Sequence, residues 1–232
     1  MSANLVRPDS PPGGLPEPSA RIVSLLLRGA RRRRAQEAVR AGTLTRVMAD
    51  DVLAAQKLPR LATQSLWLLI GSAALYALCV GASRRFWQSG SLFGDAPLWQ
   101  RIALLIVTNI IGYILVIPAH EATHALVILA LGGRPRFGLR LPLAAYCTAP
   151  NQLFTRNGYL VVALAPLIAL SLAGLAVAAL APDNAATLLL AFAGNVSGAI
   201  GDLEAMRGVR KLQRDTLIAD TETGYIAYQP NT

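Results

Sequence analysis

Hydrophobic positions dominate four long stretches of the chain, which are separated by short polar segments. The apolar runs cover residues 61–82, 102–131, 159–180 and 185–206. Each run is long enough for an α-helix to cross a hydrocarbon core of about 30 Å. One such run could be the buried helix of a soluble protein, but four of them in 232 residues favour a membrane protein. The second run exceeds the length of a crossing, so its helix is expected to tilt or to leave the bilayer near its end.

The second run contains a His-Glu-x-x-His pattern at His120, Glu121 and His124. In a helix both imidazoles lie on one face and can bind one metal ion, while Glu121 can reach a water molecule there as general base. The pattern also occurs by chance on polar faces of soluble helices. Here, however, three ionisable groups fall within five residues of an apolar run, which is costly unless a divalent cation offsets it. The motif therefore predicts a zinc ion held by His120 and His124, with Glu121 catalytic.

Two histidines leave a catalytic zinc site one protein ligand short, so another buried donor is needed. The fourth run offers Asp202, its deepest acidic residue, and Asn195, which lies nearly two turns earlier on the same face. Asn195 is a candidate to orient the substrate or to stabilise an oxyanion. Glu204 is the rival donor, but it points nearly opposite to Asp202 and is expected to form an interfacial ion pair near Arg207. A solvated Asp202 at the membrane interface is the alternative.

Composition and charge support the membrane class and suggest an orientation. The chain is 53% hydrophobic and 15% charged, with a net charge of +9 and a mean hydropathy of +0.43. Basic residues concentrate near the N-terminus, in the 132–157 loop and after the fourth run. The positive-inside rule then predicts a multi-pass protein of the cytoplasmic (inner) membrane with both termini in the cytoplasm. The second and fourth runs would cross in the same direction, with residues 120–124 and the end of the fourth run at similar depth.

The segments outside the apolar runs differ in character. Residues 1–19, rich in proline and glycine, are predicted to form a disordered tail without the apolar region of a cleavable signal peptide. Residues 20–60 are predicted to form a basic, partly amphipathic cytoplasmic segment that contacts anionic lipids. Nucleic acid is the less favoured partner, because the arginine run at 31–34 lacks interleaved aromatic residues. The remainder is divided into a transmembrane metalloprotease-like domain, 61–208, and a cytoplasmic tail, 209–232.

Residues 134–150 alternate basic and apolar side chains at a period of roughly two. This pattern predicts a hairpin or extended segment near the site, which could pair with an unwound substrate. An ordinary positive-inside loop is the alternative. Neither a disulfide nor a metal site is indicated for Cys79 and Cys147. The predicted fold class is an all-α membrane protein of about four transmembrane helices, with a short extended or hairpin segment after the second and a basic N-terminal cytoplasmic extension.

From about residue 102 to residue 207 the chain resembles membrane zincin peptidases that are similar to site-2 protease-type intramembrane zinc metalloproteases. The resemblance rests on His120-Glu121-x-x-His124, Phe137-Gly138, Tyr146-Cys147, Leu164-Ala165-Pro166, Gly194-Asn195 and Gly201-Asp202-Leu203. In site-2 proteases an aspartate from a later span completes the zinc site, which implies that role for Asp202. The Asp-Gly signature of those enzymes appears here as Gly201-Asp202-Leu203, and no PDZ-like domain is evident, which leaves substrate and regulation open.

The predicted function is that of an intramembrane zinc metalloprotease that cleaves membrane-embedded or interfacial segments of a protein or peptide substrate. The alternative is a non-catalytic zinc-binding membrane scaffold or regulator, in which the fourth coordination position would be closed. Membrane di-iron hydroxylases need many more histidines than the two present. Metal transport is disfavoured, because one deep site without a second polar path does not provide a route.

Overall fold

The computed structural model describes residues 44–87, 93–140, 144–150 and 152–230. Four helical stretches dominate them: α2 (Leu58–Phe86), α3 (Leu98–Ala130), α4 (Arg156–Leu180) and a broken stretch, Pro182–Val209. All four are long and apolar enough to cross a membrane. They coincide with the predicted apolar runs to within a few residues at each end, which confirms the number and position of the long apolar helices.

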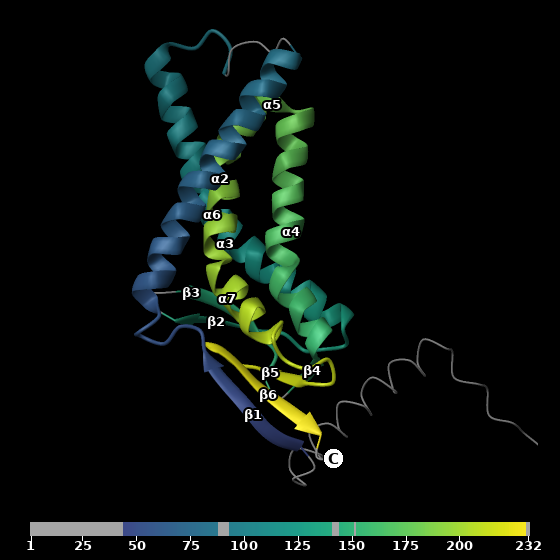
Figure 1. Cartoon of the computed structure of the whole chain (residues 1–232). Coiled ribbons are helices and arrows are strands. Elements are labelled where there is room, and N and C mark those ends of the chain that lie inside the picture. The colour runs from purple at the N-terminus through teal and green to yellow at the C-terminus, as the bar shows by residue number, and fades with distance from the viewer. Residues whose placement is uncertain (1–43, 88–92, 141–143, 151, 231–232) are drawn as a thin grey trace, which may run out of the picture.

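The fourth stretch consists of α5 (Pro182–Ala185), η1 (Ala186–Leu188), α6 (Leu189–Gly198) and α7 (Ile200–Val209). Asn109 of α3 supports the irregular start of α6. Its Nδ2 donates to the Ala186 carbonyl (3.0 Å), and its Oδ1 accepts from the Leu190 N–H (2.9 Å). These bonds satisfy backbone groups that the short 3₁₀ turn leaves without helical partners. Between α6 and α7 the helix is interrupted at Ala199, directly after Gly198, and α7 continues toward the sheet (Figure 1).

A glycine brings α3 and α6 close together. A Cβ atom on Gly194 would lie 2.7 Å from the ring of Tyr113, so only glycine permits this approach of the two helices. Gly198 and Gly201 make no such contact, because no atom lies within 4 Å of a Cβ placed on either residue. Both instead line the cavity described below.

The predicted hairpin after the second helix is present. Strands β2 (Arg136–Arg140) and β3 (Ala144–Thr148) pair antiparallel, with Phe137 opposite Cys147 and Leu139 opposite Ala145. Directly opposed residues share one face of the hairpin. On this face Ala145 and Cys147 of β3 line the cavity. Their partners on β2, Phe137 and Leu139, are 62% and 76% exposed. The hairpin therefore forms one wall of the cavity and leaves its larger apolar side chains uncovered by the described chain.

A second sheet corrects the predicted all-α class. Four antiparallel strands occur in the order β1 (Leu44–Asp51), β6 (Gly224–Pro230), β5 (Leu217–Asp220) and β4 (Leu153–Thr155). Strand β1 comes from the predicted basic segment and β5–β6 from the predicted tail, while residues 1–43 lie outside the described residues. Strands β4 and β5 contain three and four residues, too few for a periodic signal. Pairing between distant segments, rather than local pattern, makes them strands.

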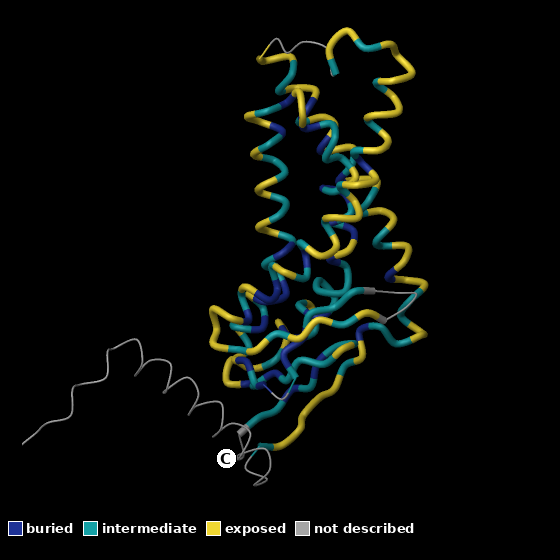
Figure 2. Tube along the Cα trace, turned by 180° about the vertical axis from the view of Figure 1, so that it is seen from behind, coloured by how far each residue is buried: buried dark blue, intermediate teal, exposed yellow. Residues whose placement is uncertain are grey.

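The sheet lies at the end of the molecule where α3 and α7 finish (Figure 1). Ile218, Tyr225 and Ala227 of β5 and β6 are almost fully buried and belong to one core with Ile128 of α3 and Val209 of α7. Figure 2 shows buried positions gathered where the helices meet the sheet, with exposed positions along the outer sides of the helices. The sheet thus closes the end of the helix bundle that carries the candidate site.

Candidate metal centre

Helix α3 presents the two histidines together. His120 and His124 are one turn apart, their ring centroids lie 5.1 Å from each other, and their exposed fractions are 8% and 6%. The helical spacing predicted this arrangement. Both rings point away from the outer surface of the bundle toward α7.

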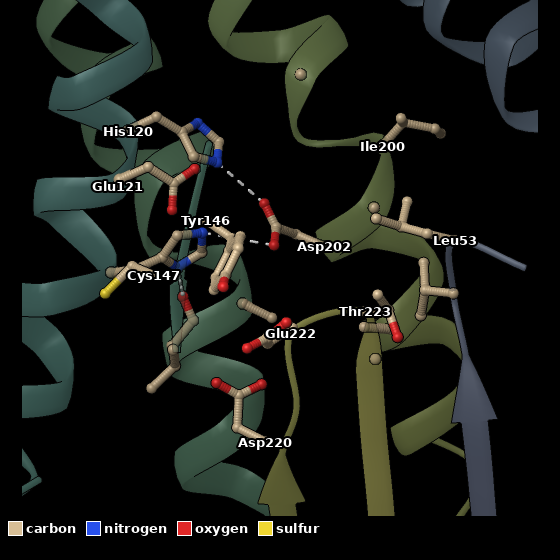
Figure 3. A pocket seen from close by; sticks show the side chains of 18 of the residues that line it. Leu53, His120, Glu121, Tyr146, Cys147, Ile200, Asp202, Asp220, Glu222 and Thr223 are labelled. Atoms are coloured by element: carbon tan, nitrogen blue, oxygen red, sulfur yellow. Dashed lines mark hydrogen bonds and ion pairs between the residues drawn. The ribbon is translucent and has the colours of Figure 1, made fainter. Parts of the chain in front are cut away.

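Helix α7 supplies Asp202 to the same point, as Figure 3 shows for His120 and Asp202. His120 Nε2 lies 3.0 Å from Asp202 Oδ2, and His124 Nε2 lies 3.4 Å from Asp202 Oδ1. Within the described part of the chain these three residues form a group whose ligand atoms all lie within 4.8 Å of one another, close enough to hold a metal ion. The sequence separation of about 80 residues is bridged by the parallel course of α3 and the fourth helical stretch.

In each ring Nε2 faces Asp202, and the other nitrogen, Nδ1, faces a hydrogen-bond acceptor. His124 Nδ1 lies 2.9 Å from the Val162 carbonyl oxygen, and His120 Nδ1 lies 3.0 Å from Asn195 Oδ1. A neutral imidazole that donates from Nδ1 has a lone pair on Nε2. Both Nε2 atoms would then direct lone pairs at the Asp202 carboxylate, which is itself an acceptor.

Such a convergence of acceptors requires a cation between them, either protons on the rings or a shared metal ion. Zinc bonds to nitrogen and oxygen are about 2.0–2.2 Å long, so neighbouring ligands of a tetrahedral zinc lie about 3.3 Å apart. The two Nε2–Oδ distances, 3.0 and 3.4 Å, bracket that value. The donor set and its spacing therefore fit a zinc ion.

Glu121 lies beside this group without belonging to it. It lines the cavity together with Cys147 of β3. Figure 3 shows the carboxylate on the same side of α3 as the His120 ring. A carboxylate next to a metal group, rather than within it, can exchange a proton with a water molecule in the cavity.

The cavity has a volume of about 370 Å³ and is bounded by parts of the chain that are distant in sequence. The metal group and Glu121 form one side of it, and strand β3 forms another. Gly198 and Gly201 of the α6–α7 junction leave open space rather than side chains along the wall. Leu53 and the β5–β6 turn, residues 221–223, also line it, and Figure 3 shows Leu53, Glu222 and Thr223 on the side opposite α3.

Asp220, at the end of β5, is a cavity residue that the sequence did not single out. Its Oδ2 accepts from the Ala149 N–H (3.1 Å), and its Oδ1 lies 3.4 Å from the Tyr159 hydroxyl. Burial raises the pKa of Asp220 to about 6, although the bond from Ala149 opposes this rise. Glu222, on the following turn, lines the same cavity. The short apolar run Tyr225-Ile226-Ala227-Tyr228, rich in residues that favour strands, was the available signal for a strand in this tail.

Cys147 lines the cavity, and its thiol does not belong to the metal group. Burial, together with the charges of Glu121 and Asp220, raises the pKa of Cys147 to about 12. Metals bind the thiolate form of cysteine, which this environment disfavours.

Two further sequence candidates occupy defined positions. Glu204 forms an ion pair with Arg207, with 3.2 Å between Oε2 and Nη1, as predicted. Asn195 is 2% exposed, and besides its contact with His120 its Nδ2 lies 3.3 Å from both the Pro166 carbonyl oxygen and Ser171 Oγ. Its predicted role toward the substrate or an oxyanion stays a prediction, since these contacts engage both ends of the amide.

Comparison with known families bears on this centre. Residues 113–217 are similar to a family model described as "Putative zincin peptidase". The matched segment contains all the proposed ligands together with Glu121 and Asn195, and it extends from α3 into β5. The match supports the zincin part of the resemblance, while the relation to site-2 proteases stays a prediction. No curated protein and no solved structure matches the chain.

Proposed function

We propose that the protein is an intramembrane zinc metalloprotease that hydrolyses peptide bonds in membrane-embedded or interfacial segments. The observation that carries the proposal is the convergence of His120, His124 and Asp202 at the wall of a cavity that Glu121 also lines. Two long apolar helical stretches supply these residues, and both are able to span a membrane. Similarity of residues 113–217 to the zincin model adds support from sequence.

His120, His124 and Asp202 are the ligands in this proposal. Zinc held there would lower the pKa of a water molecule and polarise the scissile carbonyl group. Glu121 accepts a proton from the attacking water and passes it to the nitrogen of the leaving amine as the C–N bond breaks. Glu121 lines the same cavity as the three ligands, which keeps the base within reach of the reacting water.

The position of β3 supports an extended substrate. A transmembrane helix hides its peptide bonds in internal hydrogen bonds, so a substrate must unwind locally before water can attack a carbonyl. Ala145 and Cys147 of β3 line the cavity beside the metal group. An unwound segment can add to the hairpin as a further strand, which would orient its carbonyl groups toward the metal group and Glu121.

The proposal also includes an orientation in the membrane and a second contact surface. The proposed orientation puts the sheet and both termini on the cytoplasmic side, because Arg136 begins β2, Arg156 begins α4 and Arg210 follows α7. These element ends lie at the end of the molecule that carries β1–β6 (Figure 1). The basic segment 20–60 contacts anionic lipids there. Cleavage would therefore occur near the cytoplasmic side of the bilayer.

A non-catalytic zinc scaffold is the alternative function. Structural zinc sites are closed by four protein ligands, whereas catalytic sites keep one position open. Three candidate ligands with a cavity of about 370 Å³ beside them favour the open type. This comparison is the reason for preferring hydrolysis over a structural role.

Incubation of the purified protein with model transmembrane peptides tests the proposal. The peptides differ only by Gly, Pro or Asn residues near the centre, which weaken a helix. We expect cleavage of the weakened peptides, mapped by mass spectrometry, and none by Glu121→Gln. Glu204→Gln is the matched control, because it removes a carboxylate from α7 that pairs with Arg207 and should leave cleavage intact. Equal cleavage by Glu121→Gln, or cleavage confined to soluble unfolded peptides, would contradict the proposal.

A further inference from the structure

Pro166 leaves a carbonyl group of α4 without its usual helical partner. In an α-helix each N–H bonds to the carbonyl four residues earlier, and proline has no N–H. The residue four positions before Pro166 is Val162, and both lie inside α4. Val162 is 7% exposed, so its carbonyl oxygen requires another donor. That donor is the Nδ1–H of His124, at 2.9 Å.

Asn195 supplies the acceptor that faces Nδ1 of His120. Its Nδ2 lies 3.3 Å from the carbonyl oxygen of Pro166, which can only accept a hydrogen bond. The amide nitrogen must therefore face α4, which turns Oδ1 toward His120 Nδ1 at 3.0 Å. An acceptor at that position selects the His120 tautomer that carries its hydrogen on Nδ1.

We propose that Pro166 and Asn195 are positioning residues that hold both imidazoles in the Nδ1–H tautomer, with Nε2 of each ring directed at the metal position beside Asp202. Pro166 acts by the N–H it lacks, because an ordinary residue there would return an N–H to the Val162 carbonyl and compete with His124. Asn195 acts by its amide orientation, which the Pro166 carbonyl sets. Position 166 of α4 thus bears on both histidines, through the missing N–H of proline for His124 and through its backbone carbonyl and Asn195 for His120.

This inference rests on the ligand assignment in the proposed function and not on peptide hydrolysis. Groups that orient metal-binding histidines change metal affinity by about 10- to 100-fold when they are removed. Nitrogen-15 labelling of histidine provides a direct readout, because the chain contains only two histidines and gives four ring-nitrogen signals. The Asp202 carboxylate competes for the ring hydrogens at Nε2 when no metal is bound, at 3.0 and 3.4 Å, so the measurement uses the full-length Asp202→Ala protein. Its spectra in detergent without metal, at alkaline pH where imidazoles are neutral, report the tautomer that the partners of Nδ1 select. The variant His120→Gln assigns the signals.

In the Asp202→Ala background we expect both rings to carry the hydrogen on Nδ1. Adding Pro166→Ala should convert part of the His124 population to the other tautomer, and adding Asn195→Leu should do so for His120 alone. In the protein that keeps Asp202, each substitution should lower zinc affinity about 10- to 100-fold. Pro118→Ala is the matched control, because Pro118 also lies inside a long apolar helix, α3. In the structure the carbonyl it leaves free, that of Ile114, does not accept from either histidine, and the control should leave all four signals unchanged.

Three results separate this inference from the function on which it rests. Hydrogen on Nε2 of either ring in the Asp202→Ala protein would overturn the positioning role, even if Pro166→Ala does not fold. Unchanged His124 signals in a folded Pro166→Ala protein would also overturn it. The expected tautomers in a protein that binds no zinc would support the positioning role and refute the proposed function.

Discussion

Replacing Asp220 with asparagine tests the electrostatic description of the cavity. The folded pKa of this carboxyl is about 6, against an ordinary value of 3.8, because burial disfavours its charge. Between these two values the unfolded chain has lost the proton while the folded protein keeps it. The folded state therefore binds more protons, and its stability falls as pH rises through this window. Above pH 6 the penalty is complete and constant.

The size of the penalty follows from the difference between the two pKa values. One pKa unit corresponds to about 1.4 kcal/mol, so a rise to about 6 gives an upper limit of about 3 kcal/mol. Asp220 lines the cavity, where water can reach the carboxylate, so we expect between about 1 and 3 kcal/mol. The asparagine side chain of the variant has no charge to desolvate and can still accept from the Ala149 N–H.

Thermal unfolding in detergent, followed by circular dichroism at several pH values between 4.5 and 7.5, measures the effect. Chelator keeps both proteins free of metal, since a cation in the cavity would change the charge balance. Asp220→Asn should gain stability relative to the wild type as pH rises, and each kcal/mol moves the midpoint by about 2–4 °C in a chain of this size. Glu222→Gln, which removes a carboxylate from the exposed turn two residues later, is the control. A pH-independent difference, or a relative gain by the wild type with rising pH, would refute the assignment.

The remaining predictions concern metal content, helix packing and orientation. Metal analysis should find about one zinc per chain. Zinc should be retained in Glu121→Gln and lost when a proposed ligand is replaced, as in His120→Ala, His124→Ala and Asp202→Ala. Zinc retained in Asp202→Ala would show that Asp202 is not a ligand. Gly194→Ala should lower the melting temperature by overpacking against Tyr113, at a cost of about 1–3 kcal/mol. Gly71→Ala, with no atom within 4 Å of the added carbon, should not, and equal losses in both variants would contradict the packing argument. Cysteine labelling should place the C-terminus in the cytoplasm, and an external C-terminus would exclude the proposed orientation.

The sequence was sufficient for those features that depend on local pattern. The four apolar helices follow from the length and continuity of the hydrophobic runs, and the β2–β3 hairpin follows from alternation over a few residues. His120 and His124 meet because i and i+4 lie on one face of any helix. The ion pair of Glu204 with Arg207 has the same kind of local cause, a spacing of three residues.

Features that join distant segments depended on the tertiary structure. The sheet of β1, β4, β5 and β6 was not predicted, because β4 and β5 contain only three and four residues and β1 finds its partner β6 more than 170 residues away in the chain. The presence of Asp220 in the cavity follows from that sheet, as does its raised pKa. Nothing in the local sequence of the C-terminal tail indicates which surface it will cover.

The surroundings of the two histidines depend partly on local sequence and partly on tertiary structure. The motif alone identified both imidazoles as candidate ligands, because the chemistry of a side chain is encoded in its residue type and its spacing. Which nitrogen of each ring faces Asp202 depends on the partners of the other nitrogen, the Val162 carbonyl and Asn195. Those partners belong to α4 and α6, and packing of three helices brings them to α3. A hydrogen bond between separate helices is decided by their relative placement, which only the assembled structure contains.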